Sequence, residues 1–211
     1  MKKKWILLWK IALILGISSI GITIVIKMDS QNKPSRQDIL TLALKGNGYE
    51  NLLVKIMQDD EEIILKYKND IMVMETKEWL LWQNLNTYET ITLVYESMLA
   101  KSGITAYINS LSRGANDGIM PKLKDKAHKY NFLREEFIKE YECIVFRLKK
   151  DEYNIHLIWI DKNTGLTVRH ESEGWLNGER DKTVATMEYK FDIVTNEDVE
   201  KPDTSGYELI K

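Results

Sequence analysis

The chain has 211 residues, of which 44 % are hydrophobic and 29 % are charged, and its formal net charge is −2 at pH 7. This length is sufficient for one domain with a hydrophobic core. Five of the 30 Lys and Arg residues lie among the first 27 residues, which contain no acid, so the remainder carries a net charge of −7. That balance argues against nucleic-acid binding, and the single cysteine excludes an internal disulfide.

The N-terminus predicts a membrane anchor. A basic start is followed by 22 residues with one charge, Lys10, in the run from Trp5 to Ile26. As a helix this run would be about 30 Å long, enough to cross the bilayer, and the lysine excess predicts a cytoplasmic N-terminus. A cleavable signal peptide is the alternative, but the apolar run continues past its small residues. We therefore expect a basic end and single-pass anchor in the cell membrane over residues 1–27, a tether over 28–37 and an extracytoplasmic domain over 38–211.

The domain begins with a short helix and continues with strands. Ser35 and Asp38 resemble a capping box, and apolar residues follow at helical spacing before the turn at Gly46 and Gly48. From Glu50 to about residue 93 the apolar period is two, which predicts successive antiparallel strands. The charge run at residues 59–62 is interpreted as a solvated hairpin tip.

The middle of the chain breaks this pattern. The apolar spacing between Tyr95 and Leu111 predicts one or two helical turns, and Gly114, Gly118 and Pro121 predict a loop over residues 112–125, where a lid could lie. Strand patterning returns from about residue 130 to residue 194. The predicted class is α+β: a transmembrane helix, then a curved antiparallel sheet forming an unclosed barrel with a few helices packed on or in it.

The clearest local signal is the hairpin "WIDKNTGLTVR" at residues 159–169, where Gly165 and Asn163 tolerate a positive φ. With "FLREEFIKEYECIVFRLK" before it and "MEYKFDIVTNEDVEKPDTSGYEL" after it, this stretch resembles the carboxyl half of the LolA-like superfamily of lipoprotein carriers, LolB, RseB-type regulators and LppX-type lipoproteins. The resemblance covers about residues 128–210, with weaker support over 50–93. It implies a bacterial half-barrel whose apolar concavity holds acyl chains, although a soluble shuttle is in conflict with the anchor.

Residues that could carry chemistry are few. His128, His156 and His170 are 28 and 14 residues apart, so a metal site would need assembly by tertiary contact. We expect no metal. Cys143 has the pattern of a buried small hydrophobe, and no nucleophile motif or phosphate loop is present. We predict no catalytic residue and no cofactor.

Aromatic side chains are the remaining candidates for the concavity, with core packing as the alternative for each. Trp79 and Trp82 are three residues apart in one strand, so their side chains are expected on opposite faces of the sheet. The candidates are Trp79, Trp82, Tyr88, Tyr95, Trp159 and Trp175. Individual ligand-binding positions are left unassigned, because a register error of one residue exchanges the two faces of a strand.

The predicted function is non-enzymatic binding of a lipid, acyl chain or lipoprotein at the outer surface of the cell membrane. The alternative is an RseB-like regulatory or scaffold module that binds a membrane protein partner. An envelope hydrolase is a third hypothesis, and only the abundance of carboxylates supports it.

Overall fold

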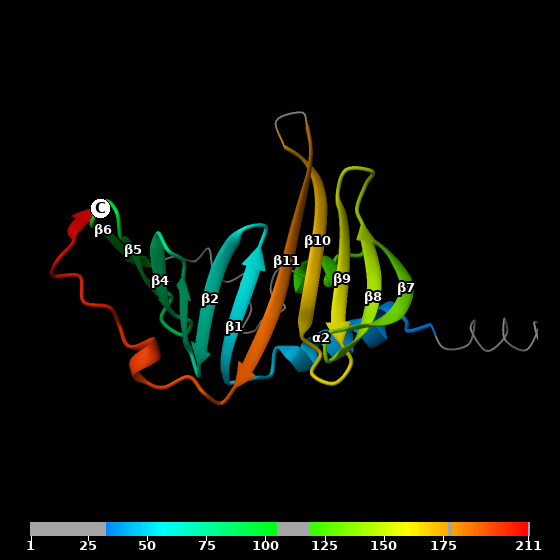
Figure 1. Ribbon diagram of the computed structural model, residues 1–211, viewed down its shortest axis with the longest axis horizontal. Helices are drawn as coiled ribbons and strands as arrows, with labels where there is room; N and C mark the ends of the chain where they lie inside the picture. The colour runs from blue at the N-terminus through cyan, green and yellow to red at the C-terminus, as the bar shows by residue number, and fades with distance from the viewer. Residues whose placement is uncertain (1–32, 105–118, 177–178, 211) are drawn as a thin grey trace, which may run out of the picture. The chain divides into compact units, whose positions relative to one another are not determined.

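The structure is a computed structural model that describes residues 33–104, 119–176 and 179–210 (Figure 1). Residues from Arg36 onward form one compact unit. Its elements are α2 (Arg36–Gly46), β1 (Asn51–Gln58), β2 (Glu61–Lys68), β3 (Ile71–Glu75), β4 (Trp79–Asn84), β5 (Glu89–Val94), β6 (Leu99–Ile104), α3 (Met120–Lys124), β7 (Lys129–Ile138), β8 (Tyr141–Lys149), β9 (Ile155–Asp161), β10 (Thr167–Leu176), β11 (Glu179–Phe191), the 3₁₀ turn η2 (Glu197–Val199) and β12 (Glu208–Ile210).

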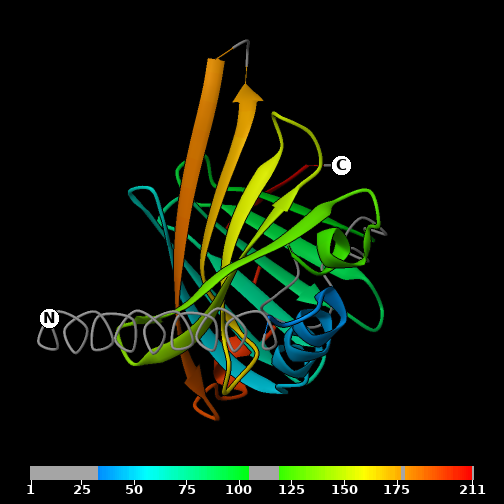
Figure 2. The same cartoon turned by 90° about the vertical axis from the view of Figure 1, so that its right-hand side faces the viewer.

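The described strands form one twelve-stranded sheet in the order β12-β6-β5-β4-β3-β2-β1-β11-β10-β9-β8-β7. All neighbours are antiparallel except β12 and β6. Consecutive strands pair from β1 to β6 and from β7 to β11, and β1 joins the two halves by pairing with β11. The sheet curves strongly without closing, so β7 and β12 are its edges (Figures 1 and 2). The predicted unclosed antiparallel barrel with few helices is confirmed.

None of the described helices is long and apolar enough to cross a membrane. The predicted span from Trp5 to Ile26 lies outside the described residues. The anchor and the orientation that it implies therefore stay predictions.

Two expectations for the middle of the chain were wrong in part. Residues 99–104 form a strand, β6, which pairs with β5 on one side and β12 on the other. The backbone N–H and C=O groups of β6 are hydrogen-bonded to these two strands. The spacing of apolar residues over so short a segment does not indicate such pairing. The end of the predicted loop is helical, because Pro121 stands in the first turn of α3, where its missing N–H has no intrahelical role. Residues 105–118 lie outside the described residues.

The two helices cover the concave face of the sheet at β8 and β9 (Figure 2). Ile39 and Ala43 of α2 and Leu123 of α3 are almost wholly buried against Phe146 and Ile158. The predicted short helix after Ser35 is thus confirmed, and most of the apolar residues that predicted it pack against the sheet, whereas Leu44 is 48 % exposed.

The segment that follows β11 packs on the opposite, convex face. Val194 and Val199 join a buried cluster with Trp82 and Ile91, and the indole Nε1 of Trp82 donates to the carbonyl of Val199 at 3.0 Å. Trp79 pairs with Val94 across β4 and β5 on the concave face, so the predicted separation of the two tryptophans is confirmed.

The predicted hairpin between β9 and β10 is also confirmed. Gly165 has a φ of +75°, and a Cβ there would lie 2.1 Å from the carbonyl oxygen of Leu42 in α2. Asp161 closes the turn, since its Oδ2 accepts bonds from the Thr164 backbone N–H at 2.9 Å and hydroxyl at 2.6 Å. The glycine therefore serves both the turn and the close approach of the helix.

Candidate functional site

The concave face carries a row of apolar side chains outside the area that α2 and α3 cover. The pairing register places them on one face, and each remains partly exposed. We call this row the apolar stripe; it consists of Ile56, Ile63, Leu65, Met74, Trp79, Leu81, Val94 and Met187. Incompletely covered apolar surface in a concavity is the usual lining of a ligand site.

The stripe runs across the strands from β11 to β5, which is five strand spacings of about 4.8 Å, or about 24 Å. The acyl region of one bilayer leaflet is about 15 Å thick. A row of this length can therefore accommodate an extended acyl chain laid across the strands.

One polar group on the same face has no hydrogen-bond partner among the described residues. Gln83 follows Leu81 by two residues, pairs with Met72 and Thr90, and is 0 % exposed. Neither its Nε2 nor its Oε1 makes a hydrogen bond within the described part of the chain. Burying an amide without partners costs about 1–3 kcal/mol, so Gln83 lowers the stability of the folded chain.

The three histidines of the chain come together on the concave face beside α3. The Nδ1 of His156 lies 3.1 Å from the Nε2 of His170, and their ring centroids are 5.2 Å apart. The ring of His128 is 6.3 Å from that of His156, and its Nδ1 contacts Asp125 Oδ2 at 3.2 Å. The three histidines and Lys122 of α3 form what we call the basic cluster.

The basic cluster places titratable basic groups together under partial burial. Burial lowers the pKa of His156 to about 3 and that of His170 to about 4, and the nearby positive charge of Lys122 contributes to both shifts. Burial also lowers the pKa of the Lys122 ammonium. Both imidazoles are therefore neutral at pH 7. Within the described part of the chain, no three His, Cys, Asp or Glu side chains are placed to hold a metal ion.

Arg36, the first residue of α2, fixes the connection that carries this cluster. Its guanidinium donates to the backbone carbonyls of Leu123 at 2.9 Å, His128 at 2.7 Å and Lys122 at 3.1 Å, and to that of Asp125. A planar guanidinium with five donors suits such a set of carbonyls. The segment from residue 122 to residue 128 is thus held to α2 by one side chain.

The other candidates take structural roles. Cys143 is fully buried and its pKa is raised to about 12, chiefly by burial, which removes thiolate reactivity at neutral pH. Trp159 is buried and donates to Glu136, and Tyr95 donates to Glu75 at 3.1 Å. Tyr88 and Trp175 are exposed and lie apart from the stripe. Of the six aromatic candidates, only Trp79 belongs to the apolar stripe.

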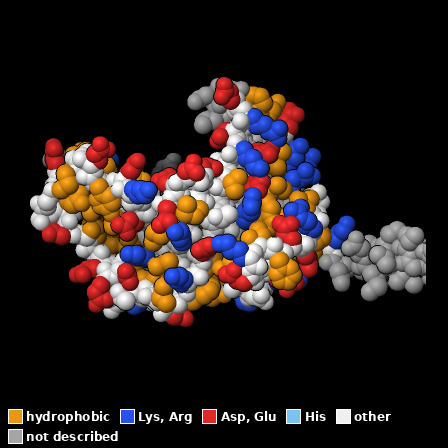
Figure 3. Space-filling model, in the orientation of Figure 1, with side chains coloured by type: hydrophobic (Ala, Val, Ile, Leu, Met, Phe, Trp, Pro, Cys, Tyr) orange, Lys and Arg blue, Asp and Glu red, His pale blue; other side chains and the backbone are white. Residues whose placement is uncertain are grey.

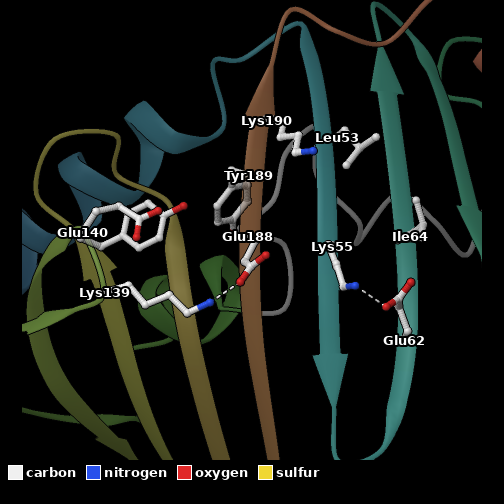
Figure 4. A pocket seen from close by; sticks show the side chains of 10 residues that line it. Leu53, Lys55, Glu62, Ile64, Lys139, Glu140, Glu188, Tyr189 and Lys190 are labelled. Atoms are coloured by element: carbon white, nitrogen blue, oxygen red, sulfur yellow. Dashed lines mark hydrogen bonds and ion pairs between the residues drawn. The ribbon is translucent and has the colours of Figure 1, made fainter.

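The convex face carries charged groups of both signs, which are interspersed in Figure 3. A pocket of about 520 Å³ opens there beside the β7–β8 turn (Figure 4). Its charges are largely paired, Lys55 with Glu62 and Lys139 with Glu188. Its lining is Leu53, Lys55, Glu62, Ile64, Lys139, Glu140, Tyr141, Glu188, Tyr189 and Lys190. The mixed lining indicates no particular ligand class.

Several solved structures are similar to this chain. A conserved protein from Thermus thermophilus, described as uncharacterized, aligns with a TM-score of 0.55 and 12 % identity over 84 % of this chain and 99 % of its own. A LolA superfamily protein from Nitrosomonas europaea aligns with a TM-score of 0.32 and 11 % identity over 80 % of this chain and 99 % of its own. The Pseudomonas aeruginosa MucA/MucB complex contains a chain that aligns with a TM-score of 0.42 and 7 % identity over 79 % of this chain and 61 % of its own.

The structures that this chain matches include the LolA superfamily protein and a putative outer membrane lipoprotein-sorting protein domain from Vibrio parahaemolyticus. At these identities the likeness concerns the fold alone. No family model and no curated protein matches the chain.

Proposed function

We propose that this protein is a non-enzymatic binding protein that holds the acyl chain of a lipid or lipoprotein on the concave face of its sheet, at the outer surface of the membrane that anchors it. The observation that carries the proposal is the apolar stripe. Its eight side chains retain solvent exposure on a face where α2 and α3 leave the sheet uncovered. Transfer of apolar surface out of water, about 25 cal/mol per Å², supplies the driving force.

The site suits binding and not catalysis. Its polar members are an amide, Gln83, and the neutral imidazoles of His156 and His170. Cys143 is buried with a raised pKa. A ligand with a long apolar part and a small polar part matches this lining, since the stripe takes the first and the imidazoles take the second.

Photo-crosslinking tests the proposal in the full-length chain. The protein is reconstituted in vesicles that contain a trace of phospholipid with a diazirine in its acyl chain, irradiated and mapped by peptide mass spectrometry. We expect adducts on the apolar stripe, above all on β1 and β4. Adducts confined to other surfaces would overturn the proposal.

Two neighbouring residues on β1 provide a matched pair of variants. Ile56 belongs to the stripe and pairs with Met187 and Ile63, whereas Met57 points to the convex face and is 36 % exposed. Ile56→Glu places a charge in the acyl site and should remove most adducts, while Met57→Glu places the same charge outside it and should not. Unfolding curves of both variants establish that each is folded.

A second candidate function is the recognition of a membrane protein partner by strand addition. The observation that favours it is the edge strand β7, a ten-residue strand that pairs only with β8 among the described strands. Phe137 on this edge is 73 % exposed. An open edge with an exposed aromatic side chain can accept an extended segment of another protein.

Crosslinking in native membranes tests this second function. A photoreactive amino acid at position 137 should capture one reproducible envelope protein, and the same amino acid at Tyr153, which is exposed but lies outside the β7 edge, should not. Capture of the same mixture from both positions would count against a specific partner at β7.

A further inference from the structure

The basic cluster lies next to the apolar stripe on the same face of the sheet. His170 pairs with Ala185 of β11, and Met187, at the end of the stripe, is two residues further along that strand. Two residues of a strand span about 7 Å, and residues at this spacing point to the same side. The cluster is therefore the polar neighbour of the stripe at its β11 end.

The cluster is richer in basic than in acidic groups. Two nearby carboxylates are already engaged: Asp125 holds the ring of His128 and the N–H of Ala127, and Glu171 pairs with Arg169 at 2.6 Å and Lys182 at 2.9 Å. Four basic side chains thus lie together in a partly buried place, those of Lys122, His128, His156 and His170. The imidazoles of His156 and His170 are neutral there. The hydrogen bond between the neutral His156 and His170 rings uses one of their two N–H groups, so an anion in that place would accept hydrogen bonds from the remaining N–H and from the ammonium at once.

We propose that the basic cluster binds a phosphate group, namely that of the head group of a lipid whose acyl chain lies on the apolar stripe. The choice of lipid rests on the proposed function; the affinity for phosphate does not. Lys122 supplies the charge, and the His156–His170 pair supplies the N–H that its internal hydrogen bond leaves over; protonation of the pair, which adds a further donor, becomes easier once the anion is bound. Arg36 is a positioning residue, since it holds the backbone of Lys122 and His128 beside the two strand imidazoles.

Metal binding is the rival for such a cluster. Two ligand nitrogens on one tetrahedral Zn²⁺ lie about 3.3 Å apart, close to the 3.1 Å between the His156 and His170 nitrogens. The adjacent Lys122 ammonium opposes a cation and favours an anion. Removal of this charge should therefore weaken the binding of phosphate and strengthen the binding of Zn²⁺. Lys122→Gln thus distinguishes the two ligands.

The chain has only three histidines, so each imidazole gives its own NMR signal. The full-length protein, labelled at histidine and held in a maltoside micelle free of phosphate, is titrated with lysophosphatidate, inorganic phosphate, monoacylglycerol and Zn²⁺ in separate arms. We expect lysophosphatidate to move the His156 and His170 signals saturably and to raise the pKa of both by about one to three. Inorganic phosphate should act at the same signals with weaker affinity, and monoacylglycerol should leave their pKa unchanged.

Lys122→Gln should weaken lysophosphatidate binding about tenfold or more, the size expected for loss of a charged hydrogen bond. Lys126→Gln is the matched control, because Lys126 is an exposed lysine of the same connection and should leave the affinity within about twofold. Equal effects of the two substitutions, or signals that shift without saturation, would overturn the phosphate site. Tight Zn²⁺ binding that strengthens in Lys122→Gln would overturn it in favour of a metal.

The arms separate this inference from the proposed function. Equal affinity for inorganic phosphate and lysophosphatidate would overturn the assignment to a lipid and identify a soluble anion. Saturable phosphate binding together with absent acyl crosslinks on the stripe would remove the proposed function alone. Acyl crosslinks on the stripe together with silent imidazole signals would remove the phosphate site alone.

Discussion

Replacement of Arg36 by Ala should destabilise the fold and, above all, loosen the connection from α3 to β7. The guanidinium donates to four backbone carbonyls, those of Lys122, Leu123, Asp125 and His128. A hydrogen bond from a charged donor contributes about 1.5–3 kcal/mol to stability. The four bonds share one side chain and that to Asp125 is exposed, so they are not additive, and we expect a loss of about 3 kcal/mol. For a domain of this size that corresponds to a fall in Tm of about 6–12 °C.

Two measurements check this prediction. Denaturant unfolding gives the loss of stability, and hydrogen exchange followed by mass spectrometry should show the largest loss of protection in residues 119–130. Arg180→Ala is the control, because Arg180 forms a surface ion pair with Glu173 and should cost under about 1 kcal/mol. If Arg36→Ala costs no more than Arg180→Ala, or if exchange rises evenly along the chain, the argument for a local clamp is wrong.

Three further predictions concern single sites. Gly165→Ala should cost several kcal/mol in denaturant unfolding, because the glycine has a φ of +75° and a Cβ would meet the Leu42 carbonyl at 2.1 Å; an unchanged midpoint would contradict that geometry. Gln83→Leu should stabilise the chain by about 1 kcal/mol in denaturant unfolding, and a loss of stability would indicate that the amide is satisfied. For His156 and His170 the pKa values in the folded state, about 3 and about 4, lie below the value of about 6.5 in the unfolded state. The unfolded state therefore binds more protons, and the free energy of unfolding falls as the pH decreases from about 6.5 to 3. Replacement of both histidines by Gln should make the free energy of unfolding less dependent on pH in that range, as measured by unfolding curves at a series of pH values.

The sheet was predictable because its strands follow simple local rules. Alternating apolar residues and turns such as Asp161 to Gly165 define each hairpin without reference to the rest of the chain. β6 escaped prediction for the opposite reason. Its six residues include Lys101, Ser102 and Gly103, and it is a strand because β5 and β12 pair with it. The β12 partner comes from more than a hundred residues later in the chain.

The site was less predictable than the sheet because it depends on register and on tertiary contact. His128, His156 and His170 carry no spacing signal, yet cross-strand pairing and the α3 connection bring their rings together. The apolar stripe follows from the alternation of β1 to β5 once the register is known, and a shift of one residue would have placed Met57 in it instead of Ile56. Gln83 looks in the sequence like any polar strand residue, and only its burial distinguishes it.

The cover of the concave face is held at both ends of α2, and this arrangement fixes the connection that carries the basic cluster. Arg36 joins the start of the helix to the connection that carries the basic cluster, and Lys45, at its end, donates to the carbonyl of Asn163 in the β9–β10 turn. Between them Ile39 and Ala43 are wholly buried against the sheet. An α-helix of eleven residues is a rigid rod of about 16 Å, so it does not absorb a displacement of one end. The connection that carries Lys122 and His128 and the β9–β10 turn therefore keep a fixed separation, so the basic cluster is organised before a ligand binds.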